Sequence, residues 1–324
     1  NIAAAASYNE PPITYKEVVE LSGNGYTKYK FTNHETNPDN YSLGNDSYKI
    51  SPEYSNTNFN NQMLRLFHYS SKEDERGKPL RTETYSSTGN LVKSIDYTYN
   101  TNAQKEDNSV FATWCPYSLG ANWQGKYVNV VQSFALYYYQ NNLTKTIEKD
   151  YGSNSTTPVT KTTTIKYESD ISNRIEEKTI DRGTGGTLLY KYTYPDDYTG
   201  VQPYQTMITR NMLSPVIEQQ EYKVTGSVTT FLRSSRTNYG FFQANTLIKP
   251  ASADTKVGTG NYNTRIVFND YDQYGNLSSY SKAQQNISEA LIWDYSRSRL
   301  VADVANATGG EISYTSFETN EVNT

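Results

Sequence analysis

Hydrophobic and polar residues alternate with a period of two along much of the chain, the spacing of a β-strand whose two faces differ. Thr, Tyr, Val and Ile, which favour strands, dominate these segments. The clearest examples are 13–21 (ITYKEVVEL), 26–32 (YTKYKFT), 94–100 (SIDYTYN), 188–194 (LLYKYTY) and 264–272 (TRIVFNDYD). Turn-forming clusters separate such segments, at 22–25 (SGNG), 86–90 (SSTGN), 181–186 (DRGTGG) and 273–276 (QYGN). Helical periodicity is scarce, so the pattern predicts an all-β fold of successive antiparallel hairpins.

One turn sequence recurs. Two copies of Tyr-x3-Gly-Asn-Leu are separated by 186 positions (271−85), and a third copy is looser, with Ser and Val after the glycine. The residues involved are Tyr85, Gly89, Asn90 and Leu91; Tyr222 and Gly226; and Tyr271, Gly275, Asn276 and Leu277. Glycine suits a turn position with positive φ, and asparagine tolerates the left-handed region. We expect Asp272 to accept a backbone N–H two residues on, and the tyrosine and leucine to pack as a cross-strand pair. The repeat therefore predicts structural corners, since a catalytic constellation is not expected three times.

Tyrosine is the main apolar residue of this sequence. Hydrophobic residues make up 35 % of the 324 residues, and 31 residues are tyrosine. An aromatic content of 14 % argues for a folded chain, because disordered sequences are poor in aromatics. Tyrosine buries a ring while its hydroxyl stays hydrated, which suits a thin or curved sheet better than a thick aliphatic core.

Charge and cysteine content exclude several classes of protein. The net charge is −4 and there is no basic run, so we expect no nucleic-acid partner and no polybasic membrane patch. No apolar stretch approaches the length of a membrane span. The single cysteine, Cys115, excludes a disulfide within the chain and a cysteine-based zinc site. The first residues lack the pattern of a signal peptide, so an exported protein would have its signal outside this chain.

The turn motif and two longer stretches carry a resemblance to a known family. Tyr271, Asp272, Gly275, Asn276 and Leu277 together resemble the YD repeat of the Rhs and teneurin-like families. The stretches 76–99 and 269–319 resemble the branch of that family found in Bacteroidetes, and they cover about a quarter of the chain. In that branch a similar turn is followed by an Ile-Trp-x-Tyr strand, a Val-Ala-x-Val segment and an Asn-Ala-Thr. The matching residues here are 292–295, 301–304 and 306–308.

The resemblance implies an architecture and a set of partners. YD repeats form β-hairpin ribbons that spiral into a hollow shell, which in toxin systems encloses a C-terminal effector domain. This sequence has no Asp-Pro-x-Gly pair like that at the self-cleaving end of Rhs shells, no recognisable toxin domain and three clear repeats. We therefore expect a curved antiparallel sheet forming part of a shell or an open relative of one. It would pair through its sheet edges with the remainder of a larger polypeptide or with a partner subunit, and act outside the cell or on its surface.

These considerations also predict the domain organisation. We expect an N-terminal extension at 1–12, a YD-repeat-like hairpin domain at 13–319 and a C-terminal tail at 320–324. A loop insertion is predicted near 101–126, where the composition changes and Gly, Pro and Asn accompany two tryptophans between stronger strand signals.

Candidate chemistry is sparse. His34 and His68 show no metal-site spacing, and no cofactor-binding motif is present. Carboxylate pairs occur at Asp196–Asp197 and at Asp270 with Asp272, where turn formation explains them better than catalysis. We therefore expect a non-catalytic structural protein whose wall encloses a cargo or displays a surface.

Two aromatic segments leave an alternative open. Trp114 and Trp123 lie in the predicted insertion, where they would either contact a glycan or pin the loop to the sheet. A secreted carbohydrate-binding module is thus the second hypothesis, and a glycoside hydrolase the third. The run at 134–140 (FALYYYQ) fits a core strand better than a ligand platform.

Overall fold

The computed structural model describes residues 14–38, 72–100, 109–119, 128–152, 157–169, 172–283, 287–294 and 297–315, with the backbone alone at 109–119, 128–136 and 184. Most of these residues lie in β-strands, and every pairing between the strands is antiparallel, so the prediction of an all-β fold of hairpins is confirmed. The chain divides into two compact units, Asn1–Asn173 and Arg174–Thr324. None of the helices in the described ranges has the length and apolar character needed to cross a membrane.

The first unit holds a meander of six strands in the order β1-β2-β3-β4-β7-β8. Their bounds are β1 (Glu17–Ser22), β2 (Gly25–Phe31), β3 (Pro79–Ser86), β4 (Leu91–Tyr99), β7 (Leu143–Asp150) and β8 (Val159–Tyr167). A short 3-10 helix, η1 (Glu73–Glu75), precedes β3. Strand β1 is the first strand in this order and forms one edge of the meander.

The stretch between β4 and β7 forms a hairpin of its own. β4 pairs directly with β7, whereas β5 (Ser109–Leu119) and β6 (Val128–Tyr137) pair only with each other in a two-stranded sheet. The loop predicted near 101–126 thus contains a strand where the structure describes it, because SVFATWCPYSL is rich in aromatic and β-branched residues. The 134–140 run contributes its first four residues to β6.

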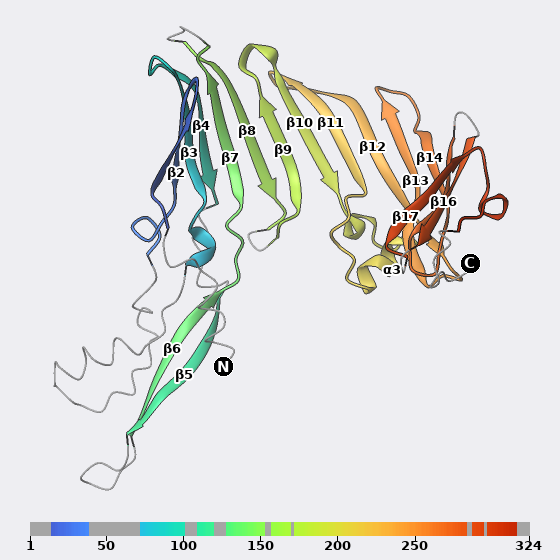
Figure 1. Cartoon of the computed structure of the whole chain (residues 1–324), viewed down its shortest axis with the longest axis horizontal. Coiled ribbons are helices and arrows are strands. Elements are labelled where there is room, and N and C mark those ends of the chain that lie inside the picture. Colours follow the sequence, from blue (N-terminus) through green and yellow to red (C-terminus); the bar gives the residue numbers. More distant parts are fainter. Residues whose placement is uncertain are drawn as a thin grey trace, which may run out of the picture. The chain divides into compact units, whose positions relative to one another are not determined.

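The second unit holds nine strands that follow one another in sequence order, from β9 to β17. They are β9 (Ile175–Asp181), β10 (Thr187–Thr193), β11 (Glu218–Thr225), β12 (Val228–Phe242), β13 (Leu247–Val257), β14 (Asn263–Tyr271), β15 (Leu277–Lys282), β16 (Ile287–Asp294) and β17 (Arg299–Ala305). Helical turns lie between strands at η2 (Gly183–Gly185), η3 (Pro195–Tyr198) and α3 (Tyr204–Thr209), and η4 (Gly309–Glu311) follows β17. The segment with η3 and α3 connects β10 to β11 and lies at one end of these strands (Figure 1).

The buried interior is small and largely polar. One apolar cluster joins Tyr204 and Met207 of α3 to Ile217 and Ile248 at the ends of β11 and β13. Elsewhere in the described residues, buried Glu, Asp, Arg, Ser, Thr and Asn side chains outnumber buried apolar ones. No second sheet packs on either meander in the described part of the chain. In the described residues each meander is therefore a single-layered sheet, and its strands are held mainly by hydrogen bonds and cross-strand contacts.

Candidate functional site: the closed ends of the hairpins

The turn at Asp272 is closed by its own residues. The Oδ1 atom of Asp272 accepts hydrogen bonds from the N–H groups of Tyr274 and Asn276, both at 2.9 Å. The N–H of Gly275 donates to the carbonyl of Asp272 at 3.0 Å, and Gly275 has φ of 86°. A residue with a Cβ is strained at that φ, so the glycine has a conformational role. The bond to Tyr274 is the aspartate turn that the sequence predicts.

The copy at Tyr85 folds in the same way with different chemistry. Ser86 stands where the other turn has aspartate, and its Oγ accepts the N–H of Asn90 at 3.2 Å. Gly89 has φ of 79° and donates to the carbonyl of Ser86 at 3.0 Å. In both copies the tyrosine lies opposite the leucine: Tyr85 pairs with Leu91 across the strands, as Tyr271 does with Leu277.

The copy at Tyr222 makes a different turn. Thr225 pairs with Val228, which leaves only Gly226 and one further residue in the turn. A register shift after Glu221 then places Tyr222 opposite Phe231, with the two rings edge to face at 5.4 Å between centroids. The same spacing of tyrosine and glycine in the sequence thus yields a tighter hairpin, because the residues after the glycine lack the asparagine and leucine of the other copies.

The two tyrosines that open the matching turns have unlike surroundings. Tyr271 is 6 % exposed; its hydroxyl donates to the carbonyl of Pro250 at 2.8 Å and its ring packs edge to face on Phe242. Burial raises the pKa of Tyr271 to about 12. Tyr85 instead stacks on Tyr26 of the neighbouring strand, with 4.6 Å between ring centroids.

The bond that Tyr271 makes recurs in other hairpins, and sequence reasoning missed it. An aromatic residue near the end of the second strand donates a hydrogen bond to a backbone carbonyl near the start of the first. The other pairs are Tyr99 to Pro79, Tyr167 to Leu143 and Tyr194 to Ile175, each at 3.0 Å, and Trp293 Nε1 to Leu277 at 2.7 Å. We call these five residues the closing aromatics. Burial raises the pKa of Tyr99 to about 12 and also raises that of Tyr167. An aromatic residue 16 to 24 positions after the start of a hairpin is the signal that identifies them.

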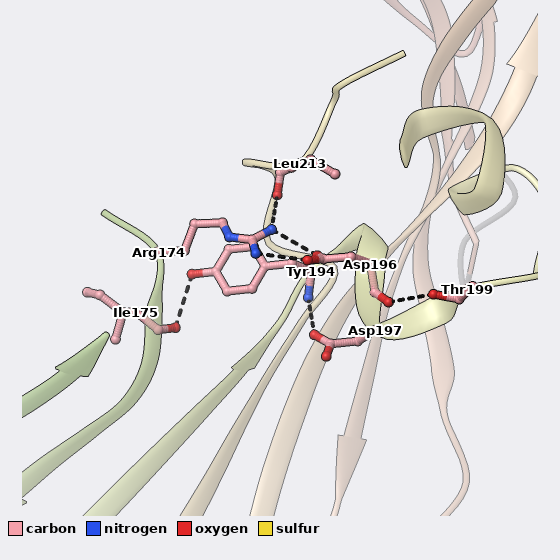
Figure 2. A network of polar contacts seen from close by, with 7 residues as sticks. All are labelled: Arg174, Ile175, Tyr194, Asp196, Asp197, Thr199 and Leu213. Carbon is pink, nitrogen blue, oxygen red and sulfur yellow. Dashed lines mark hydrogen bonds and ion pairs between the residues drawn. The ribbon is translucent and has the colours of Figure 1, made fainter. Parts of the chain in front are cut away.

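The aspartates singled out in the sequence are held by structural bonds. Figure 2 shows Arg174 bound to both carboxylate oxygens of Asp196 at 2.8 Å, while its guanidinium also donates to the carbonyl of Leu213 at 3.0 Å. Asp197 accepts the N–H of Tyr194 at 2.8 Å (Figure 2). The hydrogen bond from Arg174 lowers the pKa of Asp196. Both carboxylates therefore fix the η3 turn to the start of β9 and the end of β10.

A buried carboxylate organises one face of β11 and β12. Glu218 is 5 % exposed, and its Oε1 accepts hydrogen bonds from Ser234 at 2.7 Å, Gln220 at 2.9 Å and the hydroxyl of Tyr262. Burial by itself raises the pKa of Glu218, but these hydrogen bonds and the charge of Arg236 outweigh it, so the pKa is lowered. The lowered pKa favours the ionised carboxylate, and three donors engage its Oε1, as expected of a structural group.

Opposite charges face each other elsewhere along the sheets. Arg233 binds Glu221 at 2.6 Å, with the glutamate side chain 11 % exposed. Asp254 in β13 accepts a hydrogen bond from the side-chain amide of Asn238 at 2.6 Å. The guanidinium of Arg236 lies 3.7 Å from the same carboxylate oxygen. These pairs join neighbouring strands, so they act as cross-strand ties.

The remaining predicted site residues are placed only in part. Trp114 lies in β5, where the structure describes the backbone alone. Trp123 and His68 lie outside the described residues, so the predicted glycan contact stays a prediction. His34 lies in the turn that follows β2, and Asp270 is exposed at the end of β14.

Comparison with known proteins gives likeness at the level of structure alone. No protein-family model and no curated protein sequence matches the chain. Among solved structures it is similar to a chain of the crystal structure of TcdB2-TccC3, with a TM-score of 0.44 and 10 % identity over 87 % of this chain. A TcdB2-TccC3-TEV structure matches 89 % of the chain with a TM-score of 0.23, and a Photorhabdus luminescens Tc holotoxin pore matches 89 % with 0.20, both at 10 % identity. The chain spans 18 %, 16 % and 15 % of those three chains, less than a fifth of each.

Proposed function

We propose that the chain is a non-catalytic wall, a segment of an exported shell of the Rhs/YD-repeat kind that encloses a cargo or displays an interaction surface. The observation that carries this proposal is the construction of the sheets. Each described meander is one layer thick, buried carboxylates such as Glu218 are hydrogen-bonded across strands, and five hairpins are closed at their ends by aromatic residues. The candidate carboxylates support it, because Asp196, Asp197 and Glu218 are engaged in bonds that hold backbone or side chains in place.

A wall segment must join further strands, and β1 is built to do so. Phe31 donates to the carbonyl of Lys16 at 3.0 Å, which fixes the alternation of hydrogen bonds between β1 and β2. Glu17, Val19 and Leu21 consequently direct their N–H and C=O groups to the outer edge. Every residue of β1 is exposed, Leu21 by 81 %, and its register with β2 contains no bulge. Such an edge is a template for another strand.

The test is residue-level hydrogen exchange on this chain alone and on the longest native polypeptide that contains it. In the chain alone, the amides of Val18 and Glu20 are expected to be protected by β2, while those of Val19 and Leu21 exchange freely. In the complete polypeptide all four are expected to be protected. Unprotected Val19 and Leu21 amides in both samples would contradict the wall proposal.

A pair of variants separates edge pairing from the folding of β1. Val19→Pro removes an outward N–H and no bond to β2, because proline is tolerated where an edge strand faces solvent. It is expected to prevent protection of Leu21 in the complete polypeptide and to leave the β1–β2 pairing intact. Val19→Thr keeps the N–H and is expected to behave as the wild type.

A further inference from the structure

The connections at one end of the strands in the second unit are bonded to one another by single side chains. Arg174 donates to the carbonyl of Leu213, and Arg210, just after α3, donates to the carbonyl of Thr246 at 2.9 Å. Gln243, in the turn between β12 and β13, donates to the carbonyl of Tyr271. Asn276, in the turn between β14 and β15, donates to the carbonyl of Arg297 at 2.9 Å. We call these four donors, Arg174, Arg210, Gln243 and Asn276, the turn belt.

Each bond of the turn belt reaches from one connection to the next along the same end of the sheet. The order is the residue just before β9, the connection between β10 and β11, and then the turns after β12, β14 and β16. At the opposite ends of these strands, none of the turns that the structure describes donates a side-chain bond to the carbonyl of a neighbouring turn. There the bonds stay within a turn, as from Gly183 to Asp181 at 2.8 Å, or reach a strand, as from Tyr262 to Glu218.

The same connections hold the chain in costly backbone conformations. Five residues other than glycine have positive φ there: Asn211 (57°), Gln243 (49°), Ala244 (53°), Asn245 (71°) and Arg297 (62°). Glutamine, alanine and arginine are disfavoured in that region, and such residues persist only where the surroundings fix them. The turn belt bonds two of these residues directly, since Gln243 donates one of its bonds and Arg297 accepts another.

A single-layered sheet with polar residues on both faces specifies its register weakly, because a one-residue slip exposes little apolar surface. We infer that the turn belt holds the ends of β9–β17 in register and makes these hairpins open together rather than one at a time. This holds whether or not the chain is part of a shell, since it concerns how the second unit opens.

Gln243→Asn tests the inference without making the positive φ at position 243 less favourable. Asparagine tolerates positive φ better than glutamine but is one methylene too short to reach the carbonyl of Tyr271. If the side chain served only the local turn, the variant would be as protected as the wild type or more so. The turn belt predicts instead about tenfold faster exchange in peptides from β10–β13 and from β14–β17, measured by hydrogen exchange with mass spectrometry on the full chain.

A second variant has a matched control in the sequence repeat. Asn276→Ala breaks the bond to Arg297, whereas Asn90→Ala removes the same side chain from the turn at Tyr85, where it bonds Thr88 of its own turn at 3.1 Å. Asn276→Ala is expected to accelerate exchange from β12 to β17, and Asn90→Ala only around its own turn. Faster exchange confined to 241–247 and 270–277 in the Gln243 and Asn276 variants would overturn the inference, as would wild-type protection in both.

Discussion

Replacing Tyr271 by phenylalanine removes one hydroxyl and keeps the ring that packs on Phe242. The hydroxyl donates to the carbonyl of Pro250 at 2.8 Å in a position where the tyrosine is 6 % exposed. A hydrogen bond of this kind contributes about 0.5–1.5 kcal/mol net, and an acceptor left unsatisfied in the interior costs about 1–3 kcal/mol. We expect Tyr271→Phe to lower the free energy of unfolding by about 1–2 kcal/mol at pH 7.5.

This deficit is expected to shrink in alkali. Burial raises the pKa of Tyr271 to about 12, whereas an unfolded tyrosine titrates near about 10. Because the folded pKa is the higher one, the stabilisation by the neutral hydroxyl is present in full below pH 10 and is lost as the pH rises through about 12. At pH 11 the wild type should have lost about 1.4 kcal/mol through this group, and phenylalanine cannot lose it. The variant and the wild type should then be nearly equal in stability.

The assay is urea unfolding of the full chain at pH 7.5, 10 and 11, followed by tryptophan fluorescence. Comparing the two proteins at each pH cancels the titration of the other tyrosines. Tyr274→Phe, three positions away and 64 % exposed, is the control and should change stability by less than about 0.5 kcal/mol. An equal deficit for Tyr271→Phe at pH 7.5 and pH 11 would refute the reasoning, and so would an equal effect of Tyr274→Phe.

Three further predictions follow from the other contacts. Asp272→Ala removes the acceptor of two backbone N–H groups. It is expected to lower the opening free energy of the β14–β15 hairpin, measured by hydrogen exchange, by about 1–2 kcal/mol. Asp270→Ala, which changes an exposed side chain, should leave that free energy unchanged. The pKa of Glu218 is lowered, so its carboxylate stabilises the fold above its ordinary pKa, and this contribution is lost as the pH falls through the folded value. The unfolding temperature measured between pH 7 and pH 3 should therefore fall less steeply for Glu218→Gln than for the wild type. Parallel curves of unfolding temperature against pH would contradict this. Arg174→Lys keeps the charge but not the two-pronged bond to Asp196, so exchange at 194–200 should rise about tenfold; unchanged exchange there would show that the charge alone suffices.

The strands and turns could be predicted because their signals are local. Alternation of period two places β14, and the Gly-Asn pair at 275–276 places the turn that follows it. The hydrogen bond from the N–H of Tyr274 to Asp272 spans two residues, so residue type and spacing suffice to expect it.

The long-range contacts could not be predicted, because they depend on register. Tyr271 in β14 reaches Pro250 in β13 across a pairing whose register shifts between Ala253 and Asp254, and nothing in the sequence there signals the shift. Gln243 donates from a left-handed conformation that its residue type disfavours. The six-residue helix α3 is too short to show a period, and its place is set by burial against Ile217 and Ile248.

The closing aromatics have a consequence for how such a chain changes length. Each of these bonds begins and ends within one hairpin, as from Tyr99 in β4 to Pro79 in β3. Duplication or loss of a whole hairpin therefore leaves every other closing bond in place, whereas insertion of a single strand would separate a donor from its carbonyl. Such a sheet can therefore lengthen or shorten by two strands at a time, because each added hairpin contains both the donor and the acceptor of its closing hydrogen bond.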